Sequence, residues 1–249
     1  MAVYQTYNAD TNHEDLTDVL TKLGDMTTPA YAKLRKVAAK NTVHEWSTYA
    51  HDDAAANAAV EGATFEYGAL TAPSRLSNYT QIVSKTFQVS QTQQAVDPAG
   101  MENEYAFRVQ VALEALGRDI EKALINGTGN SGASGTAREM TGILSFITTN
   151  ISTGTGTGRA LSENELNGLI EDCYSNGGRP DWILASYTQQ NKLAQLMSAN
   201  REYNDGNTTF TSQMLVYQSP FGRLVVEGDS QIDSDTLAVL QKDMWAVAQ

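Results

Sequence analysis

The amino-acid sequence predicts an α+β protein made of a long two-armed polar ribbon, one long helix and a compact α/β lobe. Alternating apolar and polar residues over 76–92 indicate an extended arm, and apolar residues at steps of three and four over 98–126 indicate the helix. An extended segment as long as 76–92 spans roughly 55 Å. A globule of 249 residues has a diameter of only roughly 45 Å. The arm must therefore bend, be interrupted or leave the body.

The ribbon has its first arm at 42–50 and an alanine- and glycine-rich tip at 51–73. The apolar positions that alternate with polar ones in the second arm are Tyr79, Val83, Phe87 and Val89. Gln81 and Ile82 break this alternation. The tip has too few large apolar residues for a core of its own, and an isolated two-stranded ribbon is marginally stable in water. We therefore expect the ribbon to lie on another surface.

The long helix is expected to begin at Asp97 and Pro98, because aspartate is a favoured N-cap residue and proline a favoured first residue of a helix. Its apolar stripe consists of Tyr105, Val109, Ala112, Leu113, Leu116, Ile120, Ala123 and Leu124. Glu104 with Arg108, four residues apart, forms a favourable pair on an exposed face. Gly127 ends the helix.

Other segments carry shorter signals. A capping-box pattern at Thr11 and Glu14 predicts a helix over 12–24, and the same pattern at Ser162 and Glu165 predicts a helix to about 175. A buried strand at 182–184, a helix at 187–199 and strands at 212–218, 222–228, 236–241 and 244–248 are expected after it. These elements form the α/β lobe.

The composition is acidic and weakly charged, with a net charge of −12 and 18% charged residues. Such a balance argues against a nucleic-acid-binding protein, whose footprint is a basic patch, although solubility alone explains it about equally well. The basic cluster Lys33, Arg35, Lys36 and Lys40 is interpreted as a solvated or salt-bridged face, with nucleic-acid contact as the alternative.

The segment that begins the sequence lacks the basic start and apolar run of a signal peptide. No stretch of the sequence approaches the ~20 apolar residues of a membrane span. The one cysteine, Cys173, excludes an internal disulfide and fits a reducing compartment. We therefore expect a protein that is made inside the cell and has no membrane partner.

The sequence offers no pattern that indicates chemistry. The glycines around 127–135 and 154–158 match neither the dinucleotide nor the phosphate-loop spacing. His13, His44 and His51 stand outside metal-binding spacings, and Cys173 is interpreted as a structural buried thiol. We therefore expect no catalytic, cofactor or metal site and no enzyme activity.

A set of short motifs occurs in one order along the chain. They are Thr28-Pro29, Asn41-Thr42, Glu45-Trp46, Glu61-Gly62, Asn78-Tyr79-Thr80-Gln81-Ile82, Val89-Ser90-Gln91-Thr92, Arg118-Asp119-Ile120-Glu121 and Ala137-Arg138-Glu139-Met140-Thr141-Gly142-Ile143-Leu144. Together they resemble a family of tailed-bacteriophage major capsid (major head) proteins, from about Asp15 through Leu184 and more weakly to the end.

The resemblance implies the Johnson fold of tailed-phage capsids. It assigns an N-terminal arm to 1–41, a β-hairpin extension loop to 42–96, a peripheral domain to 97–160 with its spine helix at 97–127, and an axial domain to 161–249. Members of this family usually continue past the axial lobe with strands that return to the peripheral domain. Since the sequence stops at Gln249, that return is expected to be missing, as in a short member or an incomplete reading frame.

The resemblance also implies a structural function. The chain would self-assemble into hexamers and pentamers that form an icosahedral head around phage double-stranded DNA. It would be made in the bacterial host cytoplasm and reside in the virion, with portal, scaffold or decoration proteins as further partners and only weak non-specific contact with packaged DNA. The aromatic residues expected to mediate self-association are Trp46, Tyr49, Phe65, Tyr67, Tyr79 and Phe87.

Two alternatives stay open at this point. An encapsulin-like compartment shell would use the same fold to hold cargo protein in place of DNA. A β-rich binding or tail module is an alternative from a different class, against which the long amphipathic helix weighs.

Overall fold

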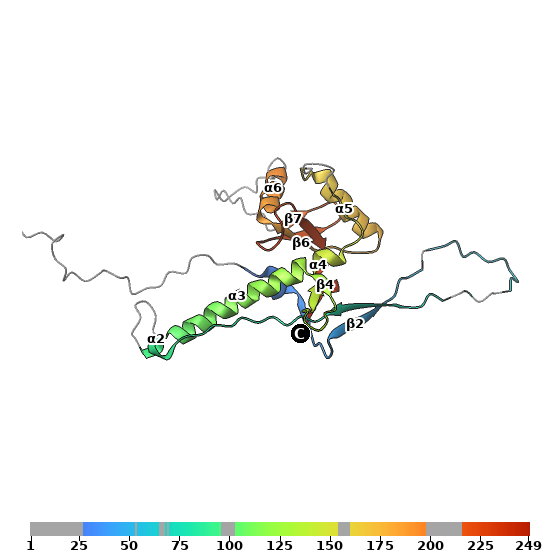
Figure 1. The fold of residues 1–249 in the computed structure, drawn as a ribbon. Coiled ribbons are helices and arrows are strands. Elements are labelled where there is room, and N and C mark those ends of the chain that lie inside the picture. The colour runs from blue at the N-terminus through green and yellow to red at the C-terminus, as the bar shows by residue number, and fades with distance from the viewer. Residues whose placement is uncertain are drawn as a thin grey trace, which may run out of the picture. The chain divides into compact units, whose positions relative to one another are not determined.

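The computed structural model describes residues 27–52, 54–64, 68, 70–95, 103–153, 160–197 and 216–249 (Figure 1). The chain divides into two compact units, which are described separately. The first comprises residues 1–27 and 83–119, and the second comprises residues 28–82 and 120–249. The helix expected at 12–24 lies outside the described residues.

A four-stranded mixed sheet forms the centre of the second unit. Its strands are β6 (Trp182–Ser186), β7 (Val216–Gln218), β8 (Arg223–Asp229) and β9 (Leu237–Leu240), in the order β7-β8-β6-β9. β6 pairs parallel with β8 and antiparallel with β9, and β7 pairs antiparallel with β8. All five residues of β6 are buried, as expected of a strand that is covered on both faces.

Two apolar cores cover the two faces of this sheet. Helices α5 (Glu163–Ser175) and α6 (Tyr187–Met197) pack against alternate residues of β6, Ile183 and Ala185. The intervening residues, Trp182 and Leu184, belong to the second core. That core also contains residues of α1 (Pro29–Lys33), the end of α3 (Glu104–Asn126), α4 (Ile143–Phe146) and β10 (Ala246–Ala248).

Local signals in the lobe agree with the expected elements. Ser162 is the N-cap of α5, and its side chain accepts a hydrogen bond from the Glu165 N–H. The turn at Pro220-Phe221-Gly222 is closed by Ser219, whose N–H donates to the Gly222 carbonyl at 2.9 Å. β7 and β8 leave this turn in the register Gln218 to Arg223. The strands expected at 212–218 and 222–228 are thus confirmed as β7 and β8, which form a hairpin, while residues 212–215 lie outside the described residues.

The last strand of the sequence pairs with a segment near its beginning. β10 runs parallel to β1 (Arg35–Val37), with Arg35 opposite Ala246 and Val37 opposite Ala248. The Gln249 N–H extends this pairing by donating to the Val37 carbonyl at 2.8 Å. Residues assigned to the expected arm and to the expected axial domain therefore share one small sheet, and the four-domain division stays a prediction.

The ribbon is shorter than predicted. β2 (Val43–Thr48) and β3 (Ser74–Tyr79) pair antiparallel, so the strand expected over 76–92 is wrong beyond Tyr79. Residues 81–90 form no strand, and Gln91–Ala95 form a short helix, α2. The Ser90 hydroxyl accepts the Gln93 N–H at 3.2 Å. This cap ends the extended run, because a serine oxygen satisfies a free N–H of the first helical turn.

Helix α3 begins at Glu104, six residues after the start expected at Pro98, which itself lies outside the described residues. The Asn103 side chain accepts the Ala106 N–H at 3.1 Å and takes the N-cap role. The predicted pair forms, since the Arg108 guanidinium lies 2.6 Å from the Glu104 carboxylate, but the expected exposure of the pair is wrong for Glu104, which is buried. Among the described residues, no helix is long and apolar enough to cross a membrane.

Two glycines allow the end of α3 to meet a small hairpin of β4 (Thr128–Asn130) and β5 (Glu139–Thr141). A Cβ on Gly127 would lie 2.3 Å from the Met140 carbonyl oxygen, and one on Gly142 would lie 2.5 Å from the Gly127 nitrogen. The Gly142 N–H donates to the Gly127 carbonyl at 2.8 Å. These backbones can approach so closely only because neither residue has a side chain.

Candidate self-association surface

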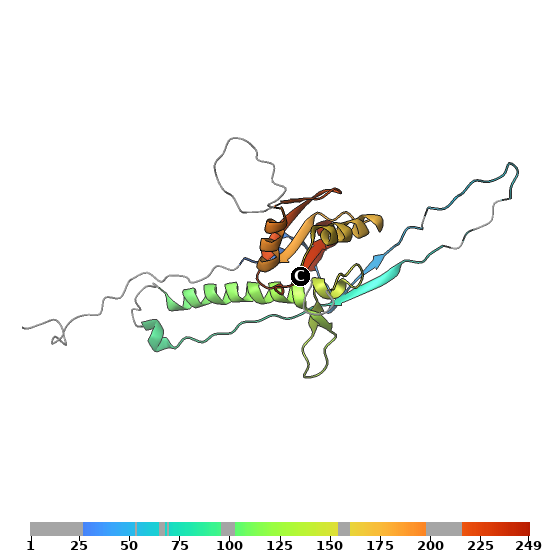
Figure 2. The same cartoon turned by 90° about the horizontal axis from the view of Figure 1, so that it is seen from above.

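The hairpin of β2 and β3 projects a long connection whose described residues are all exposed. Every described residue from Glu45 to Ser77 is exposed. The described residues between the two strands form neither helix nor strand, and they continue beyond the strand ends (Figure 2). At the far end the Ala63 N–H donates to the Val60 carbonyl at 3.0 Å, with Gly62 at φ 83°. The connection thus has an ordered turn, but none of its described side chains is buried.

The base of the hairpin, in contrast, is fixed to β5 by a side-chain amide. Asn78 Nδ2 donates to the Thr141 carbonyl at 3.1 Å, and Asn78 Oδ1 accepts the Thr141 N–H at 2.8 Å. Gln81 Oε1 accepts the Met140 N–H at 3.3 Å. The Asn78 amide therefore makes the two paired bonds to Thr141 that a neighbouring strand would otherwise make, and we call this contact the clamp. This inward role of Gln81 explains why the apolar alternation breaks there and leaves Ile82 exposed.

Trp46 joins the hairpin to α4 and to the residue before β10 through a row of aromatic rings. Its ring centroid lies 6.1 Å from that of Phe146 and 6.2 Å from that of His44. Phe146 in turn meets Trp245 edge-on at 6.2 Å. The tryptophan still has 36% of its surface exposed. Leu76 lies opposite it in the strand register and is also exposed, so the pair presents an apolar face next to the clamp.

Tyr49 follows β2 directly and is 54% exposed. Its ring meets that of His51 at right angles at 5.5 Å. Val60 and Leu70 lie further out in the connection, and Leu70 is 96% exposed. These two residues were missed by sequence reasoning, although isolated large apolar residues in an alanine-rich tip were the signal that could have found them.

The structure does not bring all the expected aromatic residues together. Tyr79 pairs with Val43, three positions from Trp46, and therefore lies on the opposite face of the hairpin, half-buried. Phe87 belongs to the first unit, where its ring lies 5.5 Å from that of Tyr105. Phe65 and Tyr67 lie outside the described residues. The role of all six in self-association stays a prediction.

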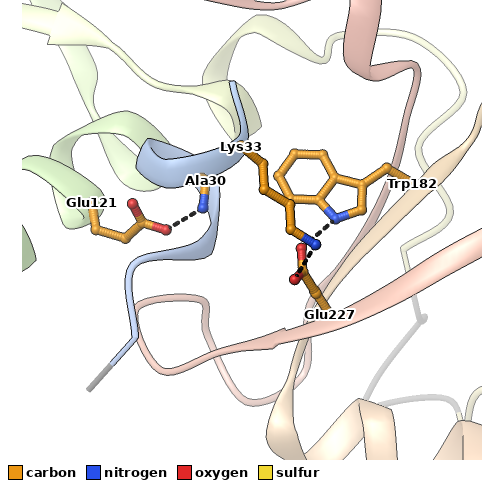
Figure 3. A network of polar contacts seen from close by, with 5 residues as sticks. All are labelled: Ala30, Lys33, Glu121, Trp182 and Glu227. Carbon is orange, nitrogen blue, oxygen red and sulfur yellow. Dashed lines mark hydrogen bonds and ion pairs between the residues drawn. The ribbon is translucent and has the colours of Figure 1, made fainter. Parts of the chain in front are cut away.

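The basic cluster is engaged within the second unit. The Lys33 ammonium lies 2.5 Å from the Glu227 carboxylate, which also accepts the Trp182 indole N–H at 3.0 Å (Figure 3). Lys36 donates to the Tyr31 carbonyl and lies 3.9 Å from the centre of the Tyr31 ring. The salt-bridged interpretation is therefore confirmed for Lys33. Nothing in these contacts favours the nucleic-acid alternative.

No group of three or more histidine, cysteine or acidic residues that could hold a metal ion occurs in the part of the chain that the structure describes. Burial raises the pKa of the Cys173 thiol, and the Asp172 carboxylate raises it further. The thiol is therefore less readily ionised than an ordinary cysteine, as a structural rather than nucleophilic residue would be.

The clamp makes one prediction for the isolated chain. We expect Asn78→Ala to lower the free energy of unfolding by about 1–3 kcal/mol, because the two hydrogen bonds with Thr141 and the one from the Tyr79 N–H are lost and the Thr141 backbone groups are left unpaired. Denaturant titration and amide hydrogen exchange at Thr141 measure the effect. Asn41→Ala is the matched control, because Asn41 bonds only to the adjacent Thr42. Unchanged protection of Thr141 in Asn78→Ala would contradict the clamp.

The fold resembles that of solved phage capsids. The chain matches a structure described as the cyanophage A-1(L) capsid asymmetric unit with a TM-score of 0.64 and 15% identity, over 96% of this chain and 76% of the other. It matches the capsid of cyanophage P-SCSP1u with a TM-score of 0.53 and 12% identity, over 90% of this chain and 69% of the other. These likenesses show that the chain, an α+β protein with an exposed hairpin, has the fold of a phage capsid protein.

Sequence comparison makes the assignment specific. Residues 3–249 match the family described as SU10 major capsid protein, and the chain belongs to that family. No curated protein matches the chain. The suspected resemblance to major capsid proteins is therefore confirmed, and the chain is a structural capsid protein of the virion. This membership implies a non-enzymatic role and favours the phage capsid over the compartment shell and the β-rich module.

Proposed function

We propose that this chain is the repeating subunit of an icosahedral phage head, and that it assembles as hexamers and pentamers around double-stranded DNA. The hairpin acts as the extension loop that lies on a neighbouring subunit. The observation that carries the proposal is the exposure of every described residue from Glu45 to Ser77, in a segment whose base is held by Asn78 and Trp46.

Exposure over so long a segment is unfavourable for a chain on its own. Ordering each backbone residue costs roughly 1–2 kcal/mol of conformational entropy, and here no burial offsets that cost. Apolar groups such as Leu70 and Tyr49 stay in water, although each would gain from burial against a neighbour. A second copy of the chain supplies the missing surface. Weak individual contacts then suffice, because a closed shell multiplies them.

The other parts fit the same proposal. Helix α3 takes the place of the spine helix, and the four-stranded sheet with α5 and α6 takes that of the axial domain. The net charge of −12 limits packaged DNA to weak non-specific contact, because carboxylates and phosphates repel one another. Portal, scaffold or decoration proteins are further partners of the assembled shell, and synthesis takes place in the bacterial host cytoplasm.

Removal of the tip tests the proposal. Replacing residues 51–73 by a short turn is expected to abolish shells in electron micrographs. The subunit should keep its denaturation midpoint, because the described residues of this stretch bury nothing in their own chain.

A second variant distinguishes the loss of side-chain contacts made by the tip from the loss of its length. Replacing 51–73 by a glycine- and serine-rich segment of equal length keeps the span but removes Val60 and Leu70. We expect this variant also to form no shells. Normal shells from either variant would overturn the role assigned to the hairpin, while shells seen with the natural sequence alone support it.

A further inference from the structure

Two acidic side chains are fully buried in the second unit, one on α3 and one on β8. Glu121 of α3 and Asp229 at the end of β8 both have 0% of their surface exposed. The end of α3 is held to the chain after β8, since Asn126 Nδ2 donates to the Gln231 carbonyl at 2.6 Å. A buried carboxylate is costly unless hydrogen bonds or an opposite charge compensate it, so the partners of each oxygen decide its charge state.

Glu121 of α3 caps the N-terminus of helix α1, although the two segments are far apart in the sequence. Its Oε1 accepts the Ala30 N–H at 2.6 Å (Figure 3). Its Oε2 accepts the Tyr31 N–H at 2.8 Å. The N-cap residue of α1, Thr28, makes no capping bond with its own side chain. The two free N–H groups of the first turn are therefore satisfied by α3 and not locally. This contact fixes the segment that precedes β1.

Asp229 is only half satisfied. Its Oδ1 accepts the Gln231 N–H at 2.6 Å, whereas its Oδ2 is buried and has no hydrogen-bond partner among the described residues. The Glu121 carboxyl lies beside the Asp229 carboxyl, within reach of a hydrogen bond that forms only when one of the two is protonated. Burial first, and then the interaction with Asp229, raises the pKa of Glu121 to about 7, while the Tyr31 and Ala30 N–H groups each lower it by less. A proton on Glu121 gives Asp229 Oδ2 the donor that it lacks.

We propose that Glu121 and Asp229 share one proton, and that this shared proton is a pH-sensitive latch that holds α1 to α3 and β8. The other charged groups of these elements are directed elsewhere. Lys33 of α1 pairs with Glu227 of β8, and Lys122, the neighbour of Glu121 on α3, is exposed. In the loop after β8, Asp233 and Asp235 are exposed. The pair thus has no buried cation beside it among the described residues.

The latch has a defined direction with pH. When it opens, Glu121 returns toward its ordinary pKa of 4.5, whereas in the closed form the pKa is about 7. Between these values the closed form holds a proton that the open form has lost. The opening equilibrium therefore rises by up to about tenfold per pH unit from about pH 4.5 to pH 7 and levels off above pH 7. Acidic solution closes the latch and neutral solution loosens it.

Amide hydrogen exchange at Ala30 and Tyr31 in the full chain tests the proposal, because these N–H groups donate to Glu121. After correction for the intrinsic exchange rate, we expect opening to increase severalfold per pH unit between pH 5 and pH 7 and then to level off. In Asp229→Asn the amide Nδ2 supplies the donor without a proton, so the profile should be flat. Asp233→Asn, a neighbouring exposed acid, should keep the wild-type profile.

A flat wild-type profile, or the same rise in Asp229→Asn, would overturn the proposal. If Asp229→Asn does not fold, Glu121→Gln replaces it, because its amide can also donate to Asp229 Oδ2. Since that amide keeps only one acceptor oxygen for the Ala30 and Tyr31 N–H groups, this variant is judged by the loss of the pH dependence and not by its level of exchange. Infrared difference spectroscopy gives a second readout. A band from a protonated carboxyl group at pH 6 is expected in the wild type and should be missing in either variant, and its persistence in both would contradict the shared proton.

Discussion

The Tyr49→Ala subunit is expected to require a protein concentration at least about tenfold higher than the wild type to form shells, while its denaturation midpoint stays unchanged. Truncating an aromatic interface anchor typically costs at least about 1.4 kcal/mol, which corresponds to a factor of ten in a binding constant. Tyr49 is 54% exposed in the single chain, so its loss removes little from the fold. Light scattering against concentration, with micrographs of the product, measures the shift.

Tyr187 provides a control of the same residue type and the same exposure, 54%, on helix α6 of the same unit. Tyr187→Ala removes the same side chain from a surface outside the hairpin. If it raised the assembly concentration as much as Tyr49→Ala, the effect would come from general surface apolarity and the hairpin would have no special role. An unchanged concentration for Tyr49→Ala would remove this residue from the interface.

Much of the fold could be predicted because its signals are local. Ser162 and Glu165 marked the start of α5 by their spacing, and the apolar run at 182–184 marked the central strand. The pattern could not show that β6 is buried on both faces by two different cores. That arrangement depends on Ala30 and Leu34, which the sequence placed in an arm.

The errors lie where distant segments meet. Alternation over 76–92 predicted one long strand, but pairing needs a partner, and β2 reaches only as far as Tyr79. Beyond that point Gln81 and Ser90 form side-chain hydrogen bonds that alternation does not reveal. The pairing of β1 with β10 joins residues more than two hundred positions apart in the chain, and no local pattern encodes it.

The candidate surface was predicted by residue type and not by geometry. Aromatic residues in a polar ribbon identified Trp46 and Tyr49, which lie where the hairpin leaves the body. The sequence could not assign faces, because a strand's faces depend on its register, and the observed register puts Tyr79 opposite Val43 and away from Trp46. The clamp at Asn78 was visible only as part of a motif, with no indication that its amide would reach Thr141.

The largest loss of subunit stability is expected from Trp182→Ala. Trp182 is among the largest side chains that are fully buried and stands in β6 between Val225 and Leu240. Replacing a buried tryptophan by alanine costs about 3–5 kcal/mol, since the cavity adds to the lost burial. The variant also loses the hydrogen bond from the indole N–H to Glu227. Glu227 pairs with Lys33 and so connects α1 to the sheet. Denaturant titration of the unassembled subunit measures the change.

Two further substitutions separate the contributions of burial and hydrogen bonding to the stability of the subunit. Trp182→Phe keeps much of the ring and removes the bond to Glu227, so a loss of about 1–2 kcal/mol is expected, and the difference from Trp182→Ala measures the cavity. Trp46→Ala, with its ring 36% exposed, should cost the subunit at most about 1 kcal/mol but impair shell formation. The two tryptophans then have opposite effects, because burial by the subunit's own chain makes a residue necessary for folding, whereas residual exposure on the hairpin leaves it available to a neighbour. A Trp182→Ala subunit as stable as the wild type would contradict the position of this ring at the centre of the core.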